Sequence, residues 1–269
     1  MTRQLTPSIA LLREVSPTLD RCELTHLARE PVDPARARAE HHQYAELLAQ
    51  LGCQIRWVPP APELPDAVFI EDTAVVVDEV AVVTRPGAPS RQPETVAVAV
   101  ALRDYRPVLT IYAPGTLDGG DVLRVGRTLY VGRSARTNAE GAAQLARHLA
   151  PYGYVVRPVE ARGCLHLKTA VTEVAEGILL CNPAWVDRHA FGDLTLLEVD
   201  PAESFAANAL RIGAVVLHAA AWPRTRERLE HRGIRTVPID VSELAKAEGG
   251  VTCCSVILRA EVAESREAA

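Results

Sequence analysis

Short apolar runs recur along the chain in pairs, and a polar or glycine break separates the two runs of each pair. The pairs VVV-DE-VAVVT, VLRV-GR-TLYVG, AVTEV-AEG-ILLC and ALRI-GA-VVLHA predict β-hairpins. A helix-like stretch follows most pairs, and then a third apolar run: CQIRWVP, PVLTIYAP, YVVRPV, LTLLEVD and IRTVPID. The pattern therefore predicts a unit of hairpin, helix and strand that repeats about five times.

Two of the predicted helices begin at recognisable signals. Asp33 is a candidate N-cap with Pro34 at the first helical position, and the apolar stripe of this helix includes Tyr44 and Leu48. Residues 137–140 have the spacing of a capping box ahead of a second apolar helical face. The fourth unit contains no convincing helix.

The two ends of the chain together supply the parts of one missing unit. The N-terminal run SIALLREVS has no hairpin partner nearby, and the last unit has only VTCCSVIL before an acidic, alanine-rich tail. If the ends pair, the repeat closes into a ring around a central channel. The predicted fold is therefore a five-bladed α/β propeller, formed as a single domain by residues 1–269, because each unit buries its apolar face only against its neighbours.

Composition and charge narrow the classes of partner. Of the 269 residues, 48% are hydrophobic and 23% are charged, as expected of one compact soluble domain. The formal net charge is −5, and no basic run is interleaved with aromatic residues, so we expect no nucleic-acid partner. The N-terminus lacks a signal-peptide core, and no run reaches about 18 successive apolar residues. We therefore expect a cytoplasmic protein with no membrane partner.

The six cysteines show no CxxC pair and no spacing typical of a structural zinc site. In a reducing compartment most of them should be free thiols. A homodimer is possible, and the sequence itself does not indicate the oligomeric state. We predict no dedicated metal site and no cofactor.

Reactive side-chain types occupy the same position in successive units. These residues are spaced 42 to 48 positions apart, at the start of each hairpin: Glu71, Asp118, His166, Asn208 and Cys253. A carboxylate, a histidine and a cysteine therefore occupy equivalent positions in different units, which we call the shared repeat address. Asn208, in the fourth unit, has no predicted chemical role.

Strand parity predicts which of these side chains face each other, because adjacent residues on a strand point to opposite sides. In VTCCSVIL, Cys254 falls on the uniformly apolar face and Cys253 on the other. The same test on LHLKTAV places His166 on the face of Cys253. Histidine can act as acid and base near neutral pH, and Asp118 is a candidate acceptor that orients it. The alternative is that both cysteines are buried structural residues.

Three carboxylates lie close together in PDAVFIED: Asp66, Glu71 and Asp72. Such a cluster suits a planar cation with several N–H donors, and guanidinium fits best. A divalent metal is the rival ligand, although hard cations usually need more oxygen donors. The Gly119-Gly120 pair beside Asp118 indicates either a crowded backbone or an ordinary turn.

Several motifs together resemble one family. They are LPDAVFIEDTAVV, VTRPGAPSR, TLDGGDVL, SARTNAEGA, LHLKTAV, AAN and EGGVTCCSVIL, and they span nearly the whole chain in the same order. By this resemblance the sequence is similar to dimethylarginine dimethylaminohydrolases, guanidine-modifying enzymes of the pentein fold. The resemblance implies hydrolysis of asymmetric dimethylarginine and monomethylarginine to citrulline, with release of dimethylamine or methylamine through a covalent thiouronium.

The resemblance also implies a role for each residue that matches a motif. Cys253 would be the nucleophile, His166 the general acid and base, and Asp118 its orienting partner. Glu71 and Asp72 would hold the guanidinium. Two arginines would bind the α-carboxylate, and a carboxylate and a stretch of main chain would bind the α-ammonium: Arg85 and Arg136, then Asp66 and the main chain near Leu24.

Lys168 narrows the substrate class. Many deiminases that act on unmodified guanidines have a carboxylate two residues after the histidine, where this chain has Lys168. A dimethylated nitrogen has no N–H to donate, so a carboxylate facing it would be left unpaired at a cost of about 1–3 kcal/mol. An arginine or agmatine deiminase, or an amidinotransferase, is the alternative. A non-catalytic propeller that binds a partner is a more remote one.

Overall fold

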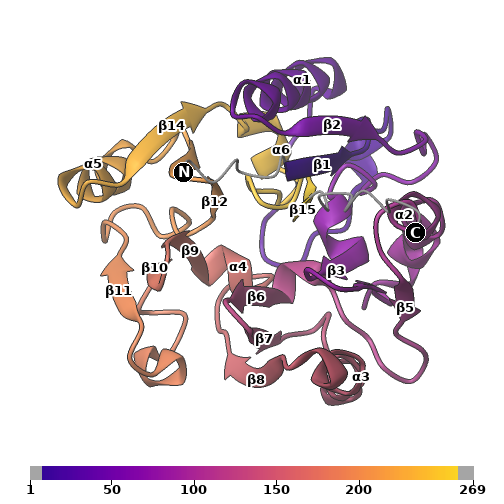
Figure 1. Ribbon diagram of the computed structural model, residues 1–269. Coiled ribbons are helices and arrows are strands. Elements are labelled where there is room, and N and C mark those ends of the chain that lie inside the picture. Colours follow the sequence, from indigo (N-terminus) through magenta and orange to yellow (C-terminus); the bar gives the residue numbers. More distant parts are fainter. Residues whose placement is uncertain (1–7, 260–269) are drawn as a thin grey trace, which may run out of the picture.

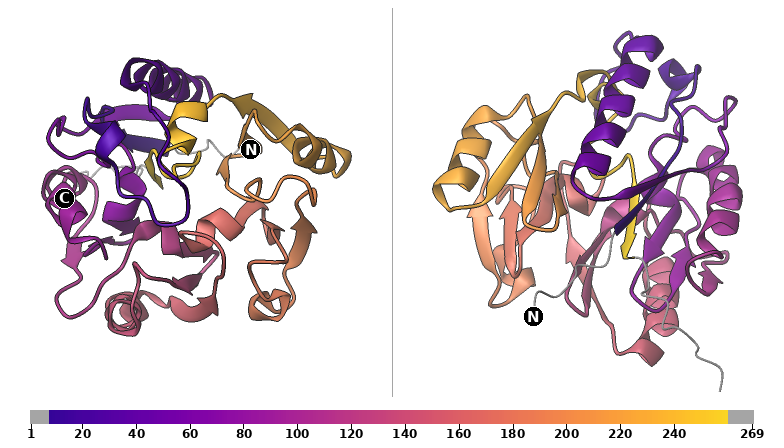
Figure 2. Two further views of the ribbon diagram at one scale, coloured as in Figure 1. Left: turned by 180° about the vertical axis from the view of Figure 1, so that it is seen from behind. Right: turned by 45° about the horizontal axis from the view of Figure 1, so that its top comes forward.

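Five three-stranded sheets form a ring in the computed structural model, which describes residues 8–259. The longer helices, which connect the second and third strands of the sheets, lie on the outside of the ring, as the opposite views show (Figures 1 and 2). In four sheets, or blades, a hairpin is joined by a third strand parallel to its second strand. The predicted hairpins, return strands and propeller are confirmed.

The four continuous blades contain the following strands: β3 (Ala74–Val76), β4 (Ala81–Val83) and β5 (Val108–Thr110); β6 (Val122–Val125), β7 (Thr128–Arg133) and β8 (Val155–Glu160); β9 (Val171–Ala175), β10 (Ile178–Cys181) and β11 (Thr195–Glu198); β12 (Ala209–Ile212), β13 (Val215–Ala219) and β14 (Arg235–Ile239).

The fifth blade joins the two ends of the described chain, as the sequence predicts. It consists of β15 (Val256–Arg259), β1 (Ser8–Leu12) and β2 (Gln54–Trp57). β15 runs antiparallel to β1, with Leu11 opposite Val256, and β1 runs parallel to β2. This antiparallel pairing closes the ring.

Most of the helices fall into two groups. Long helices connect the second and third strands of a blade: α1 (Pro34–Gln50), α2 (Thr95–Leu102), α3 (Ala139–Leu149) and α5 (Pro223–His231). Short helical turns stand ahead of the first strand of a blade: η2 (Ile70–Thr73), η4 (Gly119–Asp121), α4 (Leu167–Ala170) and α6 (Ser242–Ala245). Within the described residues, no helix combines the length and apolar character that a membrane crossing requires.

Two local expectations for helices are confirmed and one is wrong. The side chain of Asp33 caps α1 by accepting from the backbone N–H groups of Ala35 and Arg36, and the fourth unit has only the 3-10 turn η6 (Arg188–Phe191). The capping box at 137–140 does not form. Asn138, rather than Thr137, caps α3 by accepting from the N–H of Gly141, because Thr137 accepts from the backbone of Asp118 instead.

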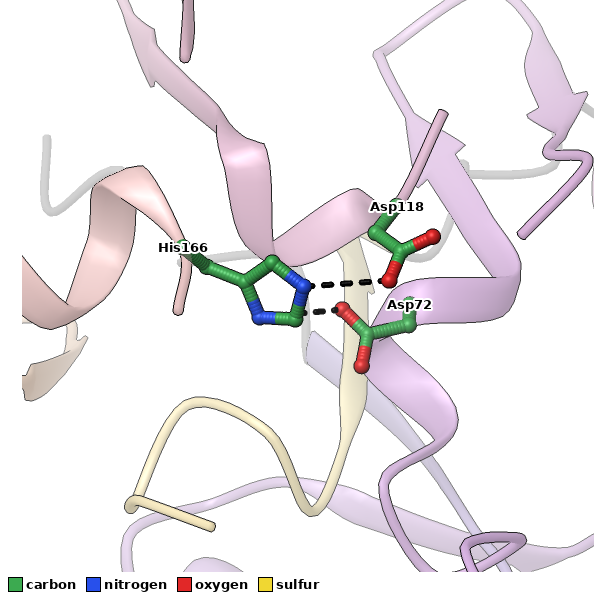
Figure 3. Close-up of side chains that lie close together, drawn as sticks. All are labelled: Asp72, Asp118 and His166. Atoms are coloured by element: carbon green, nitrogen blue, oxygen red, sulfur yellow. Dashed lines mark hydrogen bonds and ion pairs between the residues drawn. The ribbon is translucent and has the colours of Figure 1, made fainter. Parts of the chain in front are cut away.

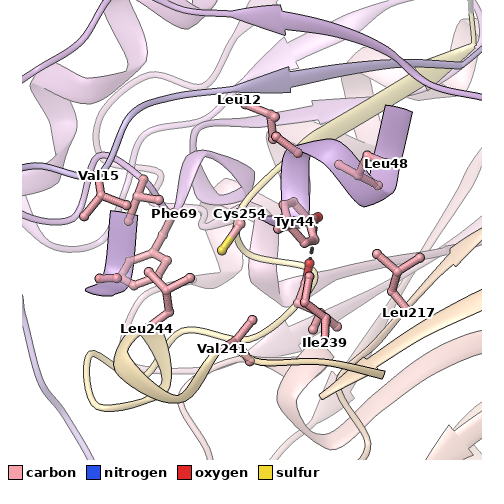
Figure 4. Close-up of a cluster of buried hydrophobic side chains, with 14 of the residues drawn as sticks. Leu12, Val15, Tyr44, Leu48, Phe69, Leu217, Ile239, Val241, Leu244 and Cys254 are labelled. Atoms are coloured by element: carbon pink, nitrogen blue, oxygen red, sulfur yellow. Dashed lines mark hydrogen bonds between the residues drawn. The ribbon is translucent and has the colours of Figure 1, made fainter. Parts of the chain in front are cut away.

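Buried apolar side chains fill each interface between neighbouring blades. For example, Val82 of β4 packs in one cluster with Leu129 of β7, and Leu180 of β10 packs with Val216 of β13. The cluster around Tyr44 joins α1 and β1 to β13 and β14 (Figure 4). The core is therefore divided into wedges, and each blade depends on both neighbours.

One buried histidine on α1 belongs to this core but not to the site described below. His41 is fully buried, and its ring stacks on Tyr44 and meets Trp57 edge-on. Burial, only partly offset by the backbone of Cys254, lowers the pKa of His41 to about 4. The histidine is therefore neutral in the folded protein at neutral pH.

This pKa makes part of the stability sensitive to acid. Between about pH 6.5 and 4, His41 is protonated in the unfolded chain but neutral in the folded chain. The free energy of unfolding should therefore fall by up to about 3 kcal/mol as the pH is lowered through this range. Denaturant titrations across this range should show a shallower fall for His41→Leu than for the wild type. Replacement of the exposed His231 by Gln is the control, and equal slopes in all three proteins would contradict the prediction.

Candidate active site

The residues at the shared repeat address converge on one end of the ring. Each stands ahead of the first hairpin strand of its blade, as predicted, but the local structure differs from the expectation. His166 lies ahead of the short helix α4, and β9 begins only at Val171. Cys253 lies in a turn, and β15 begins only at Val256. Strand parity was therefore the wrong reason for placing these two side chains together, although they line one cavity.

His166 is held by two carboxylates (Figure 3). Its Nε2 donates to Asp118 Oδ2 over 3.0 Å, and its Nδ1 lies 3.8 Å from Asp72 Oδ1. The other oxygen of Asp118 accepts from the backbone N–H of Gly87. Asp118 thus fixes the orientation of the ring, which is the geometry expected of a histidine that transfers protons.

These carboxylates also determine the charge of the histidine. Burial alone would lower the pKa of His166, but Asp72, Asp118 and the nearby Asp121 raise it to about 9. Burial likewise opposes ionisation of Asp72, but His166 and Arg91 lower the pKa of Asp72 to about 2. The histidine is therefore protonated and Asp72 is ionised at neutral pH.

The two glycines after Asp118 are required by crowding, which decides between the two readings of this pair. A Cβ on Gly119 would lie 2.0 Å from the backbone oxygen of Glu71, and one on Gly120 would lie 2.6 Å from Nδ1 of His166. The backbone N–H of Gly120 also donates to Asp72. Only glycine lets η4 approach η2 and the histidine this closely.

Arg91 is a residue of the site that the sequence did not reveal. It is buried, with its Nη1 2.6 Å from Asp72 Oδ2, while its Nε and Nη2 bind both oxygens of Glu94. Arg85, the arginine predicted from the same motif, is half-buried and donates to the carbonyl of Gly115. Arg85 does not border the cavity, whereas Arg91 does. Nothing in a single sequence distinguishes these two arginines of TRPGAPSR.

A surface loop occupies the groups predicted to bind the amino-acid end of a substrate. Asp66 accepts from the backbone N–H of Glu23, and Nη2 of Arg136 donates to Thr25 Oγ. Leu24, between these two loop residues, is half-buried and packs against the apolar core. Both Asp66 and Arg136 border the same cavity as His166 and Cys253, which has a volume of only about 10 Å³.

Glu71 is engaged by protein groups rather than open to the cavity. Nζ of Lys168 lies 2.5 Å from Glu71 Oε1, and the Thr252 hydroxyl donates to Oε2. Asn208 donates to Thr252 Oγ1 and to the carbonyl of Lys168, and accepts from the N–H of Thr252. Asn208, which had no assigned role, therefore joins the residues before Cys253 to those after the histidine.

Cys253 has the exposure expected of the reactive cysteine, and Cys254 does not. Cys254 is fully buried, whereas Cys253 borders the cavity. Burial, together with the charges of Glu71 and Asp72, raises the pKa of the Cys253 thiol to about 12. The thiol is therefore protonated at neutral pH in this state.

One group among the described residues has the spacing of metal ligands. The ligand atoms of Asp72, Asp118 and His166 lie within 4.8 Å of one another. Arg91 and the backbone N–H groups of Gly120 and Gly87 already occupy the carboxylates, so an ion would have to displace them. The expectation of no dedicated metal site stays a prediction.

The charge of His166 can be tested independently of any activity. A histidine NMR titration should give a midpoint near pH 9 for His166, and Asp72→Asn should move it toward the ordinary value near 6.5, because the largest contribution that raises this pKa is then removed. Asp78→Asn, at a carboxylate paired with Arg124, is the matched control. An unchanged midpoint in Asp72→Asn would contradict the electrostatic assignment.

Comparisons with known proteins indicate one family. A family model described as "N,N dimethylarginine dimethylhydrolase, eukaryotic" matches residues 27–259. The dimethylarginine dimethylaminohydrolase of Streptomyces coelicolor is 43% identical over 251 residues, which cover 93% of this chain and 96% of that protein. The same-named Pseudomonas aeruginosa protein is 37% identical over 234 residues, covering 86% and 91%.

A solved structure supports the same assignment. The Pseudomonas aeruginosa enzyme, as a mutant complexed with citrulline, superposes with a TM-score of 0.88 at 34% identity and covers 94% of this chain and 100% of that one. The five-bladed architecture is therefore the pentein fold. The chain belongs to the dimethylarginine dimethylaminohydrolase family.

Proposed function

We propose that the protein hydrolyses Nω-methylated arginines to citrulline and dimethylamine or methylamine. The observation that carries this proposal is the meeting of Cys253, the His166–Asp118 pair and the ionised Asp72 around one cavity. Within a family of hydrolases that act on C–N bonds, this arrangement supplies a nucleophile, a proton donor and a site for a cation.

Substrate recognition follows from the charges in and next to the cavity. Asp72, which borders the cavity, would bind the guanidinium, and Glu71, which lies next to it, would help to frame the guanidinium. Asp66 and the main chain near Leu24 would bind the α-ammonium. Arg136 would bind the α-carboxylate, and we move the second arginine role from Arg85 to Arg91, because Arg91 borders the cavity and holds Asp72.

The reaction begins with a change in the charge of the thiol. Burial and the two carboxylates of Glu71 and Asp72 keep the Cys253 thiol protonated. When the substrate cation binds beside Asp72 and Glu71, it offsets the negative charges, and the thiol releases its proton to solvent. The thiolate then adds to the central guanidinium carbon. His166 gives its proton to the methylated nitrogen, and the amine departs to leave a cationic thiouronium on Cys253.

The second half of the reaction uses His166 in its neutral form. His166 removes a proton from water, and the resulting hydroxide adds to the thiouronium carbon. The adduct loses its hydroxyl proton to solvent and expels the Cys253 thiolate, which releases citrulline and leaves His166 protonated for the next cycle. Asp118 stabilises the imidazolium each time it forms, without taking its proton. No step requires a metal or an organic cofactor.

Features of the site disfavour the deiminase alternatives and the non-catalytic propeller. Many deiminases that act on unmodified guanidines have a carboxylate two residues after the histidine, but here Lys168 stands there and is paired with Glu71. Agmatine has no carboxylate to offer Arg136, which borders the cavity. A non-catalytic propeller would have no use for a cysteine and an oriented histidine on one cavity.

Location and assembly remain part of the proposal. We propose a cytoplasmic, single-domain protein, and the six cysteines are all free thiols, as a reducing compartment favours. A homodimer is also proposed. Val96 and Val100 on α2 are exposed apolar side chains that a second copy could cover, and light scattering after size-exclusion chromatography would measure the mass.

The substrate assignment is tested by product analysis. Purified protein is incubated with asymmetric dimethylarginine, monomethylarginine, arginine and agmatine, and citrulline and the released amine are quantified. We expect citrulline with dimethylamine or methylamine in equal amounts. Ammonia from arginine, without any methylamine product, would replace this proposal by the deiminase alternative.

The nucleophile is tested by a matched pair of variants. Cys253→Ser should lower citrulline formation by at least about 1,000-fold, because a hydroxyl cannot replace the thiolate. Cys254→Ala, which changes the fully buried neighbour, should keep activity within severalfold. The opposite ranking of the two variants would exclude Cys253 as the nucleophile.

Glu248 anchors the loop that covers the cavity. Its backbone is left-handed, with φ of 60°, which is uncommon for a residue other than glycine. Its carboxylate accepts from the backbone N–H groups of Thr25, His26 and Leu27 at 2.9, 2.5 and 2.7 Å. Since the same loop contacts Asp66 and Arg136, it must yield to the amino-acid end of a substrate and then close over it.

Loss of the Glu248 carboxylate should weaken substrate binding more than it slows the chemical steps. Glu248→Ala should raise KM about tenfold and leave kcat within about threefold, since hydrogen bonds to a charged group contribute about 1.5–3 kcal/mol. Trypsin should also cleave faster after Arg29 in this loop. Glu227→Ala, at an exposed position of α5, is the control, and unchanged KM and cleavage in Glu248→Ala would refute the anchor.

A further inference from the structure

A second and much larger cavity, of about 290 Å³, adjoins Cys253. It lies between the loops that leave β13 and β14, the turn that carries Cys253, and the covering loop. Its surface is mostly apolar, and among the residues that form it are Phe205, Ala220, Trp222, Val241 and Val251. We call this cavity the apolar chamber.

The reactive thiol stands where the apolar chamber meets the smaller cavity bordered by His166, Asp72 and Arg136, which we call the charged cavity. Cys253, Leu165 and Glu248 border both, whereas Asp72 and Arg136 border only the charged one. His166 directly follows Leu165, and Thr169 of α4, the short helix that begins after His166, borders the chamber. A guanidine nitrogen within reach of His166 can therefore carry a substituent that points into the chamber.

The chamber is larger than the proposed substrates need. A methyl group is about the size of a water molecule, whose share of liquid volume is about 30 Å³. Two methyl groups would therefore leave most of the chamber unfilled. Its size approaches that of small-ligand sites, which are apolar with a few polar groups, and Asn208 and Ser242 supply such groups at its border.

We propose that the apolar chamber binds the N-alkyl substituent of the substrate and admits substituents larger than methyl. The substrate class is then Nω-alkyl-L-arginines, at least to propyl. This proposal rests on the proposed function, because it assumes that Cys253 attacks a guanidinium whose amino-acid end lies in the charged cavity. Within that reaction the chamber sets which alkyl amine can leave.

Small side chains create the space in the chamber. Three successive alanines at the end of β13 and just after it, Ala219 to Ala221, form one wall. The backbone N–H of Ala220 donates to the carbonyl of Ile239, so this wall is fixed to β14, and the side chain of Ala220 is exposed. A leucine at Ala220 would fill part of the chamber without entering the packed core.

The experiment compares Nω-methyl-, Nω-ethyl- and Nω-propyl-L-arginine by citrulline release. Burial of each added methylene is worth up to about fourfold in kcat/KM, so the propyl-to-methyl ratio should lie between about one and about sixteen in the wild type. Ala220→Leu should lower this ratio at least about tenfold. Ala139→Leu, at an exposed position at the start of α3, should leave the ratio unchanged.

The outcomes separate the chamber from the proposed function. If methylarginine is hydrolysed with a propyl-to-methyl ratio below about one-tenth, the proposed role of the chamber is wrong and the proposed function stands. The same conclusion follows if Ala220→Leu does not alter the ratio. Hydrolysis of propylarginine without methylarginine supports the chamber and overturns the methylated substrate. If neither is hydrolysed, calorimetry on Cys253→Ser decides: tighter binding of propylarginine than of methylarginine supports the chamber, and equal or weaker binding overturns it.

Discussion

The antiparallel pairing of β15 with β1 is the constraint on which the site depends. Cys253 stands just ahead of β15, so its position is fixed only when the last strand joins the first. Behind it, the hydroxyl of Tyr44 donates to the carbonyl of Val251 and lies 2.7 Å from Ser255 Oγ. In front, the N–H of Glu71 donates to the carbonyl of Cys253. Closure of the ring therefore sets the nucleophile between two blades, and local sequence alone could not hold it.

A cluster of buried charges beside the site is stabilised by mutual hydrogen bonds. Arg91 lies between Asp72 and Glu94 and satisfies both carboxylates with direct hydrogen bonds. Burial raises the pKa of Glu94 to about 7 even though Arg91 opposes that shift. Removal of one partner of such a buried pair typically costs about 3–5 kcal/mol, because the other charge is left uncompensated. The cluster thus adds little stability for its own sake, and its value lies in holding Asp72 ionised beside His166.

The sequence predicted the fold well because nearly every unit repeats the same order of hairpin, helix and strand. Hairpins, return strands, the N-cap at Asp33 and the pairing of the chain ends follow from local pattern and from the need to bury apolar faces. The site was predicted in part. Reactive residue types at one repeat address indicated convergence, but His166 and Cys253 sit on turns whose side-chain directions no periodicity encodes. Arg91 and Glu248 were missed because their roles depend on contacts with residues distant in the sequence, which hydrophobic pattern does not record.

The ion pair between Lys168 and Glu71 links specificity to the position of the nucleophile. The lysine neutralises a carboxylate whose other oxygen binds Thr252, the residue before Cys253, and Asn208 ties Thr252 back to the carbonyl of Lys168. A carboxylate in place of Lys168 would therefore do more than face the leaving nitrogen: it would lie against Glu71, and two like charges in contact disfavour ionisation of both. A change of substrate from alkylated to unmodified guanidines through replacement of Lys168 thus requires a change at Glu71 as well. The Lys168–Glu71 contact affects both the region of the leaving nitrogen and the residues that position Cys253.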